Sequence, residues 1–576
     1  MSPAPSTSSP APASPPLRRR WPAWKAAVAG GIVVAVALLL LLATFPSPTP
    51  PGSPPGPAVR AVVAGPSGPA VPLSGGFLGV NLRADGGPLD AAAAAALNAT
   101  PVRLVRWPGG GLADRLDPLG DGGQGVIYAE NGTASVAPIS TASFVAWCER
   151  ISCRSIVTLP GEIDEPSYAA AIVTYVETDL HFRPTYWEIG NEPGLWNRFG
   201  IPWANWSTAA NVGVTPSAYA VVVQSYVAAI RAVDPAAAII GLGGVGLSGV
   251  GETTWIRDTV SRNGPNLSAI AIHVYPGGAL SGPRPEAAWT ASLDGNAGLD
   301  HRVASDLAAM RAACAACALS LLVDEYGAAT NVTDGDGLAG GYLAEYLAAM
   351  IAQALPLPVA SLDYFVFQLG TYGAWFDMAG NPSPSYLLYA ALGRYLGAFA
   401  APWNVSAPLP GLLAAGGGAS AGSLPNLLLV NTNATVSFTV DLARSYPNAS
   451  RGIAWIWNGA AAAPTTGPVG SAAAAAFPVP PASVVLLSGI GVWQPPAAPA
   501  AAGRTAPLGA LPVGERPDPV VIAAGAAPAT AARLPSRTAP VYARREPIGS
   551  RKPSGAGPPR VPLPKGAGRF HRRNVL

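Results

Sequence analysis

The stretch LSLLVDEYG at residues 319–327 is an apolar run that ends abruptly in polar side chains. Such a run, with no alternation between apolar and polar residues, is typical of a strand that is buried on both faces of a parallel sheet. The stretch YWEIGNEP at 186–193 has the same character and also carries a glutamate near its end. These two stretches therefore predict buried strands with carboxylates at their carboxyl ends.

Runs of this kind recur through the region 76–398. They are GFLGVNL (76–82), RLVRWPG (103–109), SIVTLPG (155–161), YWEIGNEP (186–193), AIIGLGGVG (238–246), AIAIHVYP (269–276), LSLLVDEYG (319–327) and LDYFVFQLG (362–370). Stretches with one apolar helical face separate them, such as PSAYAVVVQSYVAAIRAVD after Thr215 and GGYLAEYLAAMIAQAL after Ala339. Eight strand–helix repeats predict an α/β fold with a (β/α)8 TIM barrel. A doubly wound open sheet is the alternative.

Polar residues at the carboxyl ends of these strands are the catalytic candidates, because that end of a barrel holds the active site. Two acids stand out, Glu192 at the end of the fourth run and Glu325 at the end of the seventh. A pair of acids flanking a sugar's anomeric carbon is what glycoside cleavage requires, one to protonate the leaving oxygen and one to attack or to activate water. The same rule selects the candidate substrate-binding residues Asn191, Arg106, His273 and Tyr275.

Aromatic residues near these strand ends could stack on the apolar C–H faces of sugar rings. Trp375 is the principal candidate, and further candidates are Trp107, Trp196 and Tyr372. Asp324 precedes Glu325 directly, so strand alternation predicts that it points away from Glu325 and has a structural role.

The motifs also resemble those of clan A glycoside hydrolases. WEIGNEP at 187–193 resembles their acid/base motif at the end of strand four, and VDEYG at 323–327 resembles their nucleophile motif at the end of strand seven. RWPGG at 106–110 is similar to a motif of the arabinofuranosidase-like families, and HVYP at 273–276 looks like the His-x-Tyr of strand six. FPVPPASVVLLSG at 477–489 resembles the closing strand of the small β-sandwich of arabinofuranosidases, β-xylosidases and heparanase-like glucuronidases.

The resemblance implies a retaining mechanism with two glutamates. Glu192 would be the general acid/base, and Glu325 would be the nucleophile, kept ionised by Arg106 and Tyr275. Asn191 would bind the 2-hydroxyl of the sugar. This chemistry needs no metal ion and no organic cofactor.

The expected protein is therefore an extracytoplasmic retaining glycoside hydrolase that cleaves O-glycosidic bonds of oligosaccharides or polysaccharides. A catalytically inactive surface protein that binds glycans or acts as a scaffold is one alternative, because a fold does not fix a function. A transglycosylase that uses the same two carboxylates is another. The motifs do not specify the sugar or the linkage.

The stretch AAVAGGIVVAVALLLLLAT at 26–44 predicts one membrane helix, because about 19 uncharged residues match the apolar thickness of a bilayer. Arg18, Arg19, Arg20 and Lys25 precede it, which places residues 1–25 in the cytoplasm and the rest of the chain outside. A cleaved signal peptide is the alternative, and the protein would then be secreted. Both interpretations place the predicted barrel outside the cytoplasm.

Three further segments complete the 576-residue chain. Residues 45–75 are rich in Pro and Gly and are interpreted as a linker and lead-in, and 399–493 as the β-sandwich. Residues 494–576 hold 13 basic and 3 acidic residues and little apolar periodicity, which predicts a disordered tail that could contact anionic lipid or surface polymer. Residues 26–493 have a net charge of −11, which argues against nucleic-acid binding.

The cysteines form two local pairs, Cys148 with Cys153 and Cys314 with Cys317. In an oxidising compartment we expect two short disulfides, and a four-cysteine zinc site or free thiols are the alternatives. Asn-x-Ser/Thr sequences suit a glycosylated surface protein. They begin at Asn98, Asn131, Asn205, Asn266, Asn331, Asn404, Asn433 and Asn448.

Overall fold

The computed structural model describes the barrel region and the region after it. The described residues are 58–129, 133–196, 214–246, 251–275, 293, 298–327, 341–370, 373–446, 448–459, 461 and 463–491. The predicted membrane helix at 26–44, the segment 1–25 before it and the tail at 494–576 lie outside these residues. Among the described helices, none combines the length and the apolar character that a membrane span requires.

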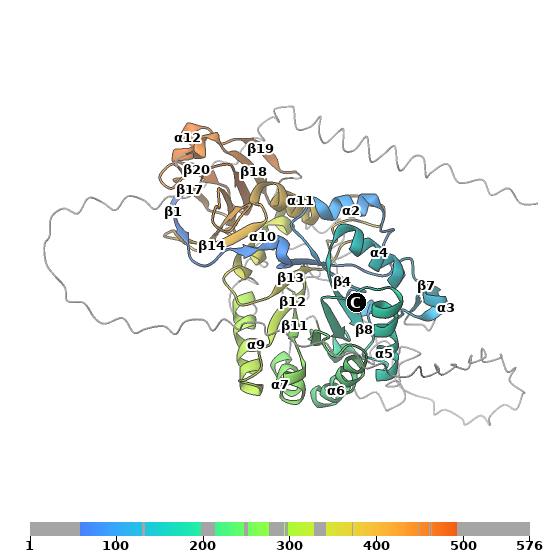
Figure 1. Ribbon diagram of the computed structural model, residues 1–576. Coiled ribbons are helices and arrows are strands. Elements are labelled where there is room, and N and C mark those ends of the chain that lie inside the picture. The colour runs from blue at the N-terminus through green and yellow to red at the C-terminus, as the bar shows by residue number, and fades with distance from the viewer. Residues whose placement is uncertain are drawn as a thin grey trace, which may run out of the picture. The chain divides into compact units, whose positions relative to one another are not determined.

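Eight parallel strands form a closed barrel in the order β10-β11-β12-β13-β3-β4-β8-β9 (Figure 1). Their bounds are β3 Leu78–Asn81, β4 Leu104–Trp107, β8 Arg154–Leu159, β9 Tyr186–Ile189, β10 Ile239–Gly243, β11 Ala269–Val274, β12 Ser320–Tyr326 and β13 Ser361–Tyr364. Each predicted run contains either one whole strand or all of that strand except a terminal residue. The barrel is thus confirmed, and the open sheet is excluded because β13 pairs with β3 and closes the ring.

Helices surround the barrel strands in Figure 1. They are α2 Ala91–Asn98, α4 Thr141–Ile151, α5 Pro166–Thr174, α6 Pro216–Val233, α7 Glu252–Asn263, α9 Leu299–Ala313, α10 Gly341–Ala354 and α11 Pro384–Ala391. Several begin at a capping side chain that accepts a free backbone N–H: Asp90 caps α2, Ser140 caps α4 and Thr215 caps α6. Helices α6 and α10 are the two that the sequence predicts after Thr215 and Ala339.

The barrel interior has an apolar layer and a polar layer. The apolar layer is one buried cluster, formed by Leu104, Ile156, Ile240, Ala269, Ala271 and Leu322. Two residues further along the same strands, and therefore on the same face, lie Arg106 on β4 and Asp324 on β12. Both are fully buried. The strands thus change from apolar to charged side chains as they approach their carboxyl ends.

A separate β domain follows the barrel, as the sequence predicts. Its strands are β14 Phe399–Ser406, β15 Leu412–Gly418, β16 Asn426–Asn431, β17 Ser437–Val440, β18 Ile453–Asn458, β19 Thr465–Pro468, β20 Phe477–Val479 and β21 Ser483–Ser488. Together with β1 (Ala58–Pro66), they form a sheet in the order β19-β18-β21-β16-β15-β14-β1-β17-β20. Leu427 and Leu429 of β16 share a buried core with Phe438 and Val440 of β17, further along that order.

The first strand of this sheet, β1 (Ala58–Pro66), precedes the barrel in sequence. Its first half pairs in parallel with β17, and its second half pairs antiparallel with β14. The interpretation of 45–75 as linker and lead-in therefore missed a strand. Its alternating Ala61 and Val63 are buried in the β-domain core, which is the reason the segment is ordered as a strand.

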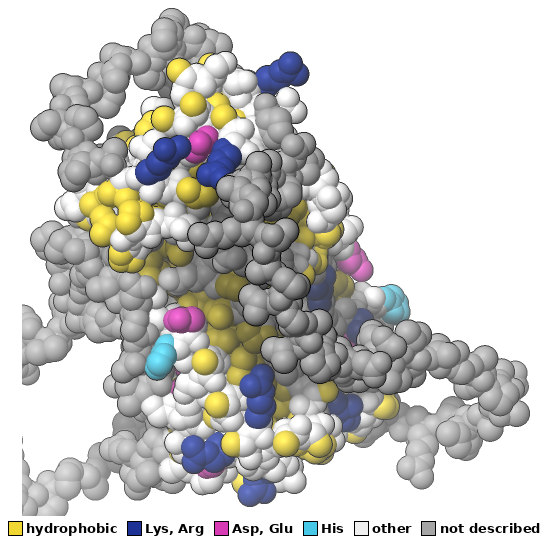
Figure 2. All heavy atoms as spheres, turned by 90° about the vertical axis from the view of Figure 1, so that its left-hand side faces the viewer, with side chains coloured by type: hydrophobic (Ala, Val, Ile, Leu, Met, Phe, Trp, Pro, Cys, Tyr) yellow, Lys and Arg dark blue, Asp and Glu magenta, His cyan; other side chains and the backbone are white. Residues whose placement is uncertain are grey.

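The barrel and the β domain meet at α10. One buried cluster holds residues of α10 together with Trp455, Trp457 and Leu486 of the β domain. A cavity of about 340 Å³ lies near this junction, lined among others by Asp300, Gln353 and Trp403. Figure 2 shows hydrophobic side chains gathered across the middle of the face it displays. The residues that line the cavity do not include any of the predicted site residues.

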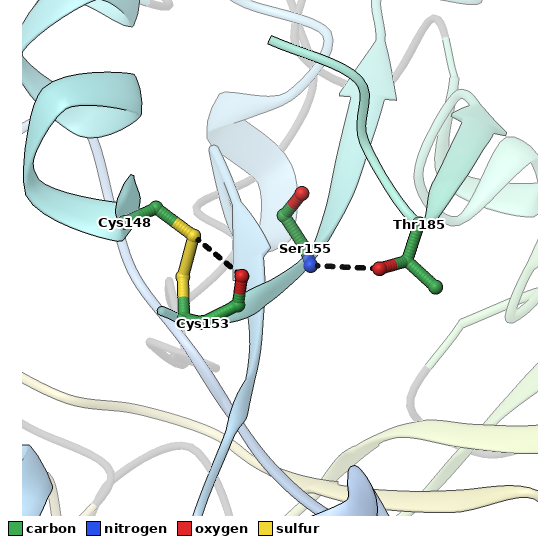
Figure 3. The surroundings of a disulfide bond; sticks show 4 residues. All are labelled: Cys148, Cys153, Ser155 and Thr185. Carbon is green, nitrogen blue, oxygen red and sulfur yellow. Dashed lines mark hydrogen bonds between the residues drawn. A yellow bond between two sulfur atoms is a disulfide. The ribbon is translucent and has the colours of Figure 1, made fainter. Parts of the chain in front are cut away.

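Both predicted disulfides are present, Cys148–Cys153 and Cys314–Cys317. Figure 3 shows the first, which joins the end of α4 to the residue before β8. Beside it the backbone N–H of Ser155 donates to the Thr185 hydroxyl at 3.2 Å. All four cysteines are described and paired, so the alternatives of a four-cysteine zinc site and of free thiols are wrong.

Candidate active site

Arg106 lies at the centre of the polar layer, and its guanidinium links four strands or strand ends. Its Nε is 2.6 Å from the Glu188 carboxylate, and its Nη1 donates to Asn81 at 2.9 Å and to Glu325 at 2.7 Å. Its Nη2 donates to the Asn191 side-chain oxygen at 2.9 Å. A planar guanidinium with donors on all three nitrogens fixes these acceptors in one plane. Arg106, Asn191 and Glu325, which the sequence predicts as site residues, are thus brought together.

Buried acids around Arg106 divide into ionised and neutral ones. Burial alone would lower the pKa of Arg106, but the carboxylates of Glu188, Asp324 and Glu325 raise it well above its ordinary value, so the cation persists. For Glu188, burial raises the pKa, but Arg106 together with hydrogen bonds from Asp324 and Thr158 lowers it overall. For Asp324, burial and the neighbouring Glu188 raise the pKa well above its usual range despite Arg106. We infer that Glu188 is ionised and that Asp324 carries a proton.

The Glu325 carboxylate accepts a hydrogen bond on each oxygen. Arg106 donates to Oε1 at 2.7 Å, and the Tyr275 hydroxyl donates to Oε2 at 2.8 Å. The side chain of Glu325 is only 4% exposed. Donors on both oxygens fix the direction of its lone pairs. Glu325 is therefore held in a defined orientation.

Glu192 lies in different surroundings. It follows β9 in the left-handed backbone region, with φ 46°, and its side chain is 12% exposed. Burial raises the pKa of Glu192 to about 7, although Arg106 partly opposes that shift. His273 Nδ1 lies 3.1 Å from Glu192 Oε1 and 3.4 Å from Glu325 Oε2. Burial lowers the pKa of His273, so a neutral ring faces both acids.

The two glutamates are close enough to act on one bond. One carboxylate oxygen of Glu192 and one of Glu325 lie within 4.8 Å of each other and of a His273 ring nitrogen. Retaining glycosidases hold their two carboxyl groups about 5–5.5 Å apart, and inverting ones hold them about 6.5–9.5 Å apart. The same three side chains could also supply one ligand atom each to a metal ion.

The prediction that Asp324 points away from Glu325 is wrong. Its carboxylate faces the barrel interior, 3.2 Å from Arg106 Nε and 3.4 Å from His273 Nε2. The register between β11 and β12 shifts by one residue here, so that Ile272 pairs with Val323 but His273 pairs with Glu325. Such a bulge lets consecutive side chains reach the same side. Asp324 and Glu325 therefore both reach the polar layer.

The prediction that Trp375 stacks on a sugar ring is also wrong, because its ring is not exposed. It is fully buried, with its ring centroid 4.9 Å from that of Tyr389 and 5.8 Å from that of Phe367. Trp107 is buried and stacks on Phe144 at 5.1 Å. Trp196 is 3% exposed, and Tyr372 lies outside the described residues. The described aromatic candidates are core residues.

Two acidic site residues escaped the sequence analysis. Glu188 holds Arg106 with both carboxylate oxygens and also accepts from the Thr158 hydroxyl at 2.6 Å. The signal was present, because an acid in the middle of an otherwise apolar strand needs a buried partner. Asp114, after the turn that follows β4, accepts the backbone N–H of Asn191 at 3.0 Å. Its position beside a glycine-rich turn offers no such signal.

Other proteins of known structure share this architecture. No family model and no curated protein sequence matches the chain. Solved structures do match: a family 51 arabinofuranosidase from Xanthomonas axonopodis pv. citri has 18% identity and a TM-score of 0.57, covering 76% of this chain and 100% of that one. A family 51 α-L-arabinofuranosidase from Bifidobacterium longum has 16% identity, the same TM-score, and covers 76% and 99%.

A xyloglucanase of glycoside hydrolase family 44 from Paenibacillus polymyxa is a third match. It has 12% identity and a TM-score of 0.53, and covers 76% of this chain and 100% of that one. At these identities the likeness is one of fold. The chain has the barrel and β-domain fold of these glycoside hydrolases, and the fold expected from the resemblance to clan A is confirmed.

Proposed function

We propose that the protein is a retaining glycoside hydrolase that cleaves O-glycosidic bonds of oligosaccharides or polysaccharides. The observation that carries this proposal is the pair of glutamates with oxygens within 4.8 Å and with contrasting surroundings. Glu325 is bound by two donors, and Glu192 has a pKa of about 7. An acid with a raised pKa beside a carboxyl group oriented by two donors is the arrangement that double displacement requires.

In the first step, the Glu325 carboxylate attacks the anomeric carbon and forms a glycosyl ester. The bond from that carbon to the leaving oxygen breaks, and Glu192 donates its proton to this oxygen. In the second step, Glu192 takes a proton from water, the water oxygen bonds to the anomeric carbon, and the ester bond breaks. Asn191, held by Arg106, would bind the 2-hydroxyl in both steps.

The test is hydrolysis of activated aryl glycosides by the full chain, with arabinofuranoside, xyloside, glucoside, galactoside and glucuronide compared side by side. Glu325→Ala should abolish turnover, and azide should restore it with formation of a glycosyl azide of inverted configuration. Glu192→Ala should also be rescued by azide, but with retained configuration, because azide then attacks the glycosyl ester.

The outcomes separate the alternatives. A folded wild-type chain that binds polysaccharide but turns over none of the glycosides supports the glycan-binding alternative and contradicts the proposal. Transfer to an added sugar acceptor in preference to water identifies a transglycosylase.

We also propose that the barrel is extracytoplasmic, on a single-pass cell-membrane protein or on a secreted one, and that it carries N-linked glycans. The two disulfides support this proposal, because such bonds persist mainly in oxidising compartments. Protease added to intact cells should degrade the barrel while cytoplasmic markers survive. Protection of the barrel in intact cells would contradict the proposal.

A further inference from the structure

Asp114 is a buried carboxylate surrounded by N–H donors at the strand ends of the barrel. It is 3% exposed. Its Oδ1 accepts the backbone N–H groups of Gly161 at 2.9 Å and Glu162 at 3.1 Å. Its Oδ2 accepts the backbone N–H of Asn191 at 3.0 Å and the indole N–H of Trp196 at 3.1 Å. One carboxylate thus ties the segment after β4 to the ends of β8 and β9.

The Trp196 ring completes this connection from the other side. Its N–H also lies 3.0 Å from the backbone oxygen of Asn191. Its ring packs against two glycines, because a Cβ added to Gly190 would lie 2.4 Å from the ring and one added to Gly161 would lie 2.8 Å from it. Both faces of the turn at Asn191 are therefore occupied, by Asp114 on the N–H and by Trp196 on the C=O.

The turn so held is strained. Gly190 has φ 71° and Glu192 has φ 46°, so Asn191 lies between two left-handed residues. A left-handed backbone is unfavourable for a residue with a side chain such as glutamate, and it persists only where surrounding contacts impose it. Hydrogen bonds to a buried carboxylate are among the stronger contacts that can do so.

We propose that Asp114 and Trp196 form a clamp that positions Glu192 for proton transfer by holding the backbone of the turn at Asn191. Asp114 and Trp196 are positioning residues, because they act through the backbone of this turn and do not touch the scissile bond. The inference rests on the proposed function, in which Glu192 is the general acid. A general acid works only within about 2.6–3.2 Å of the oxygen it protonates, so a small shift of the turn reduces proton transfer.

The test uses Trp196→Phe, which removes the indole N–H together with the outer edge of the ring that lies against Gly161 and Gly190. Trp187→Phe is the matched control: Trp187 lies on the adjoining strand β9, is 1% exposed, and donates its indole N–H to Glu177 at 3.0 Å. Asp114→Asn is the second variant, because an amide nitrogen would face N–H donors whichever way it is turned. Thermal unfolding establishes that each variant is folded.

Each variant is assayed on two glycosides of the same sugar, one with a 2,4-dinitrophenolate leaving group and one with an alkyl leaving group. The dinitrophenolate departs without a proton, whereas the alkoxide needs Glu192. We expect kcat/KM for the alkyl glycoside to fall ~10-fold in Trp196→Phe and ~100-fold in Asp114→Asn, since general acid catalysis contributes about 10²–10⁴-fold. For the dinitrophenyl glycoside the loss should stay below ~3-fold.

Equal losses on both substrates, or losses no larger than those of Trp187→Phe, would overturn the clamp. Failure of the proposed function gives a different result, namely no azide rescue of Glu192→Ala and no effect of the leaving group in that variant. If Glu192→Ala behaves as a general-acid variant but Trp196→Phe does not, only the clamp is wrong.

Discussion

The apolar and polar layers of the barrel interior lie two residues apart on the same strands, yet they are built on opposite principles. Leu322 and Asp324 of β12 are both fully buried, as are Leu104 and Arg106 of β4. In the first layer apolar side chains pack against one another. In the second, one cation neutralises several acids that would otherwise be too costly to bury. The comparison teaches that the apolar layer contributes stability while the polar layer retains charge for chemistry.

Replacing Arg106 with methionine should have the largest effect. Among the described residues, Arg106 is the only cation that faces Glu188, Asp324 and Glu325, and the substitution removes it. Leaving buried acids without their partner costs about 3–5 kcal/mol of the free energy of unfolding. Activity should fall at least ~10⁴-fold because Glu325 is no longer oriented. Denaturant unfolding and glycoside hydrolysis measure the two losses; a loss of activity under ~10-fold would contradict the prediction.

Tyr275→Phe should have a smaller effect, because it removes one of the two donors to Glu325 and leaves Arg106 in place. A hydrogen bond to a charged group contributes about 1.5–3 kcal/mol, which predicts a drop of about 10–150-fold in kcat/KM. The drop should appear with both good and poor leaving groups, since Tyr275 contacts Glu325, the proposed nucleophile. A drop confined to poor leaving groups would place Tyr275 with Glu192 instead.

The pH profile sharpens the difference between the two glutamates. Because burial raises the pKa of Glu192 to about 7, kcat/KM for an alkyl glycoside should fall above that pH, by about tenfold per pH unit, as the proton is lost. Below pH 7 Glu192 is protonated, so this limb of the pH profile of kcat/KM should be flat. The limb should vanish in Glu192→Gln, and its persistence there would assign it to another group.

Leu322→Ala probes the apolar layer alone and should have the smallest effect on catalysis. The cavity it creates should cost about 2–5 kcal/mol of the free energy of unfolding. The kcat/KM of the folded fraction should change less than ~3-fold, because the strand end two residues away is held by Arg106. Chemical denaturation and assays well below the melting temperature separate the two readouts, and a larger catalytic loss would mean that the layers are coupled.

The strands and the closeness of Glu192 to Glu325 could be predicted because each signal is local. Every barrel strand is an apolar run, and Glu192 and Glu325 stand where such runs end. The orientation of Asp324 could not be predicted, since it depends on a bulge between β11 and β12. Strand β1 was missed because its partners, β14 and β17, lie far along the chain. Trp375 was misread because nearness to a strand end does not reveal that aromatic neighbours cover its ring.

The position of β1 also has a consequence for how the chain is assembled during synthesis. Val62 pairs with Ser406, so a strand made before the barrel finds its partner only after the whole barrel has been made. Contacts between segments this distant in sequence form slowly, because a long loop must close first. The barrel is in effect inserted into the β domain. The β domain is completed last, and it depends on β1, which is among the first of the described segments to be synthesised.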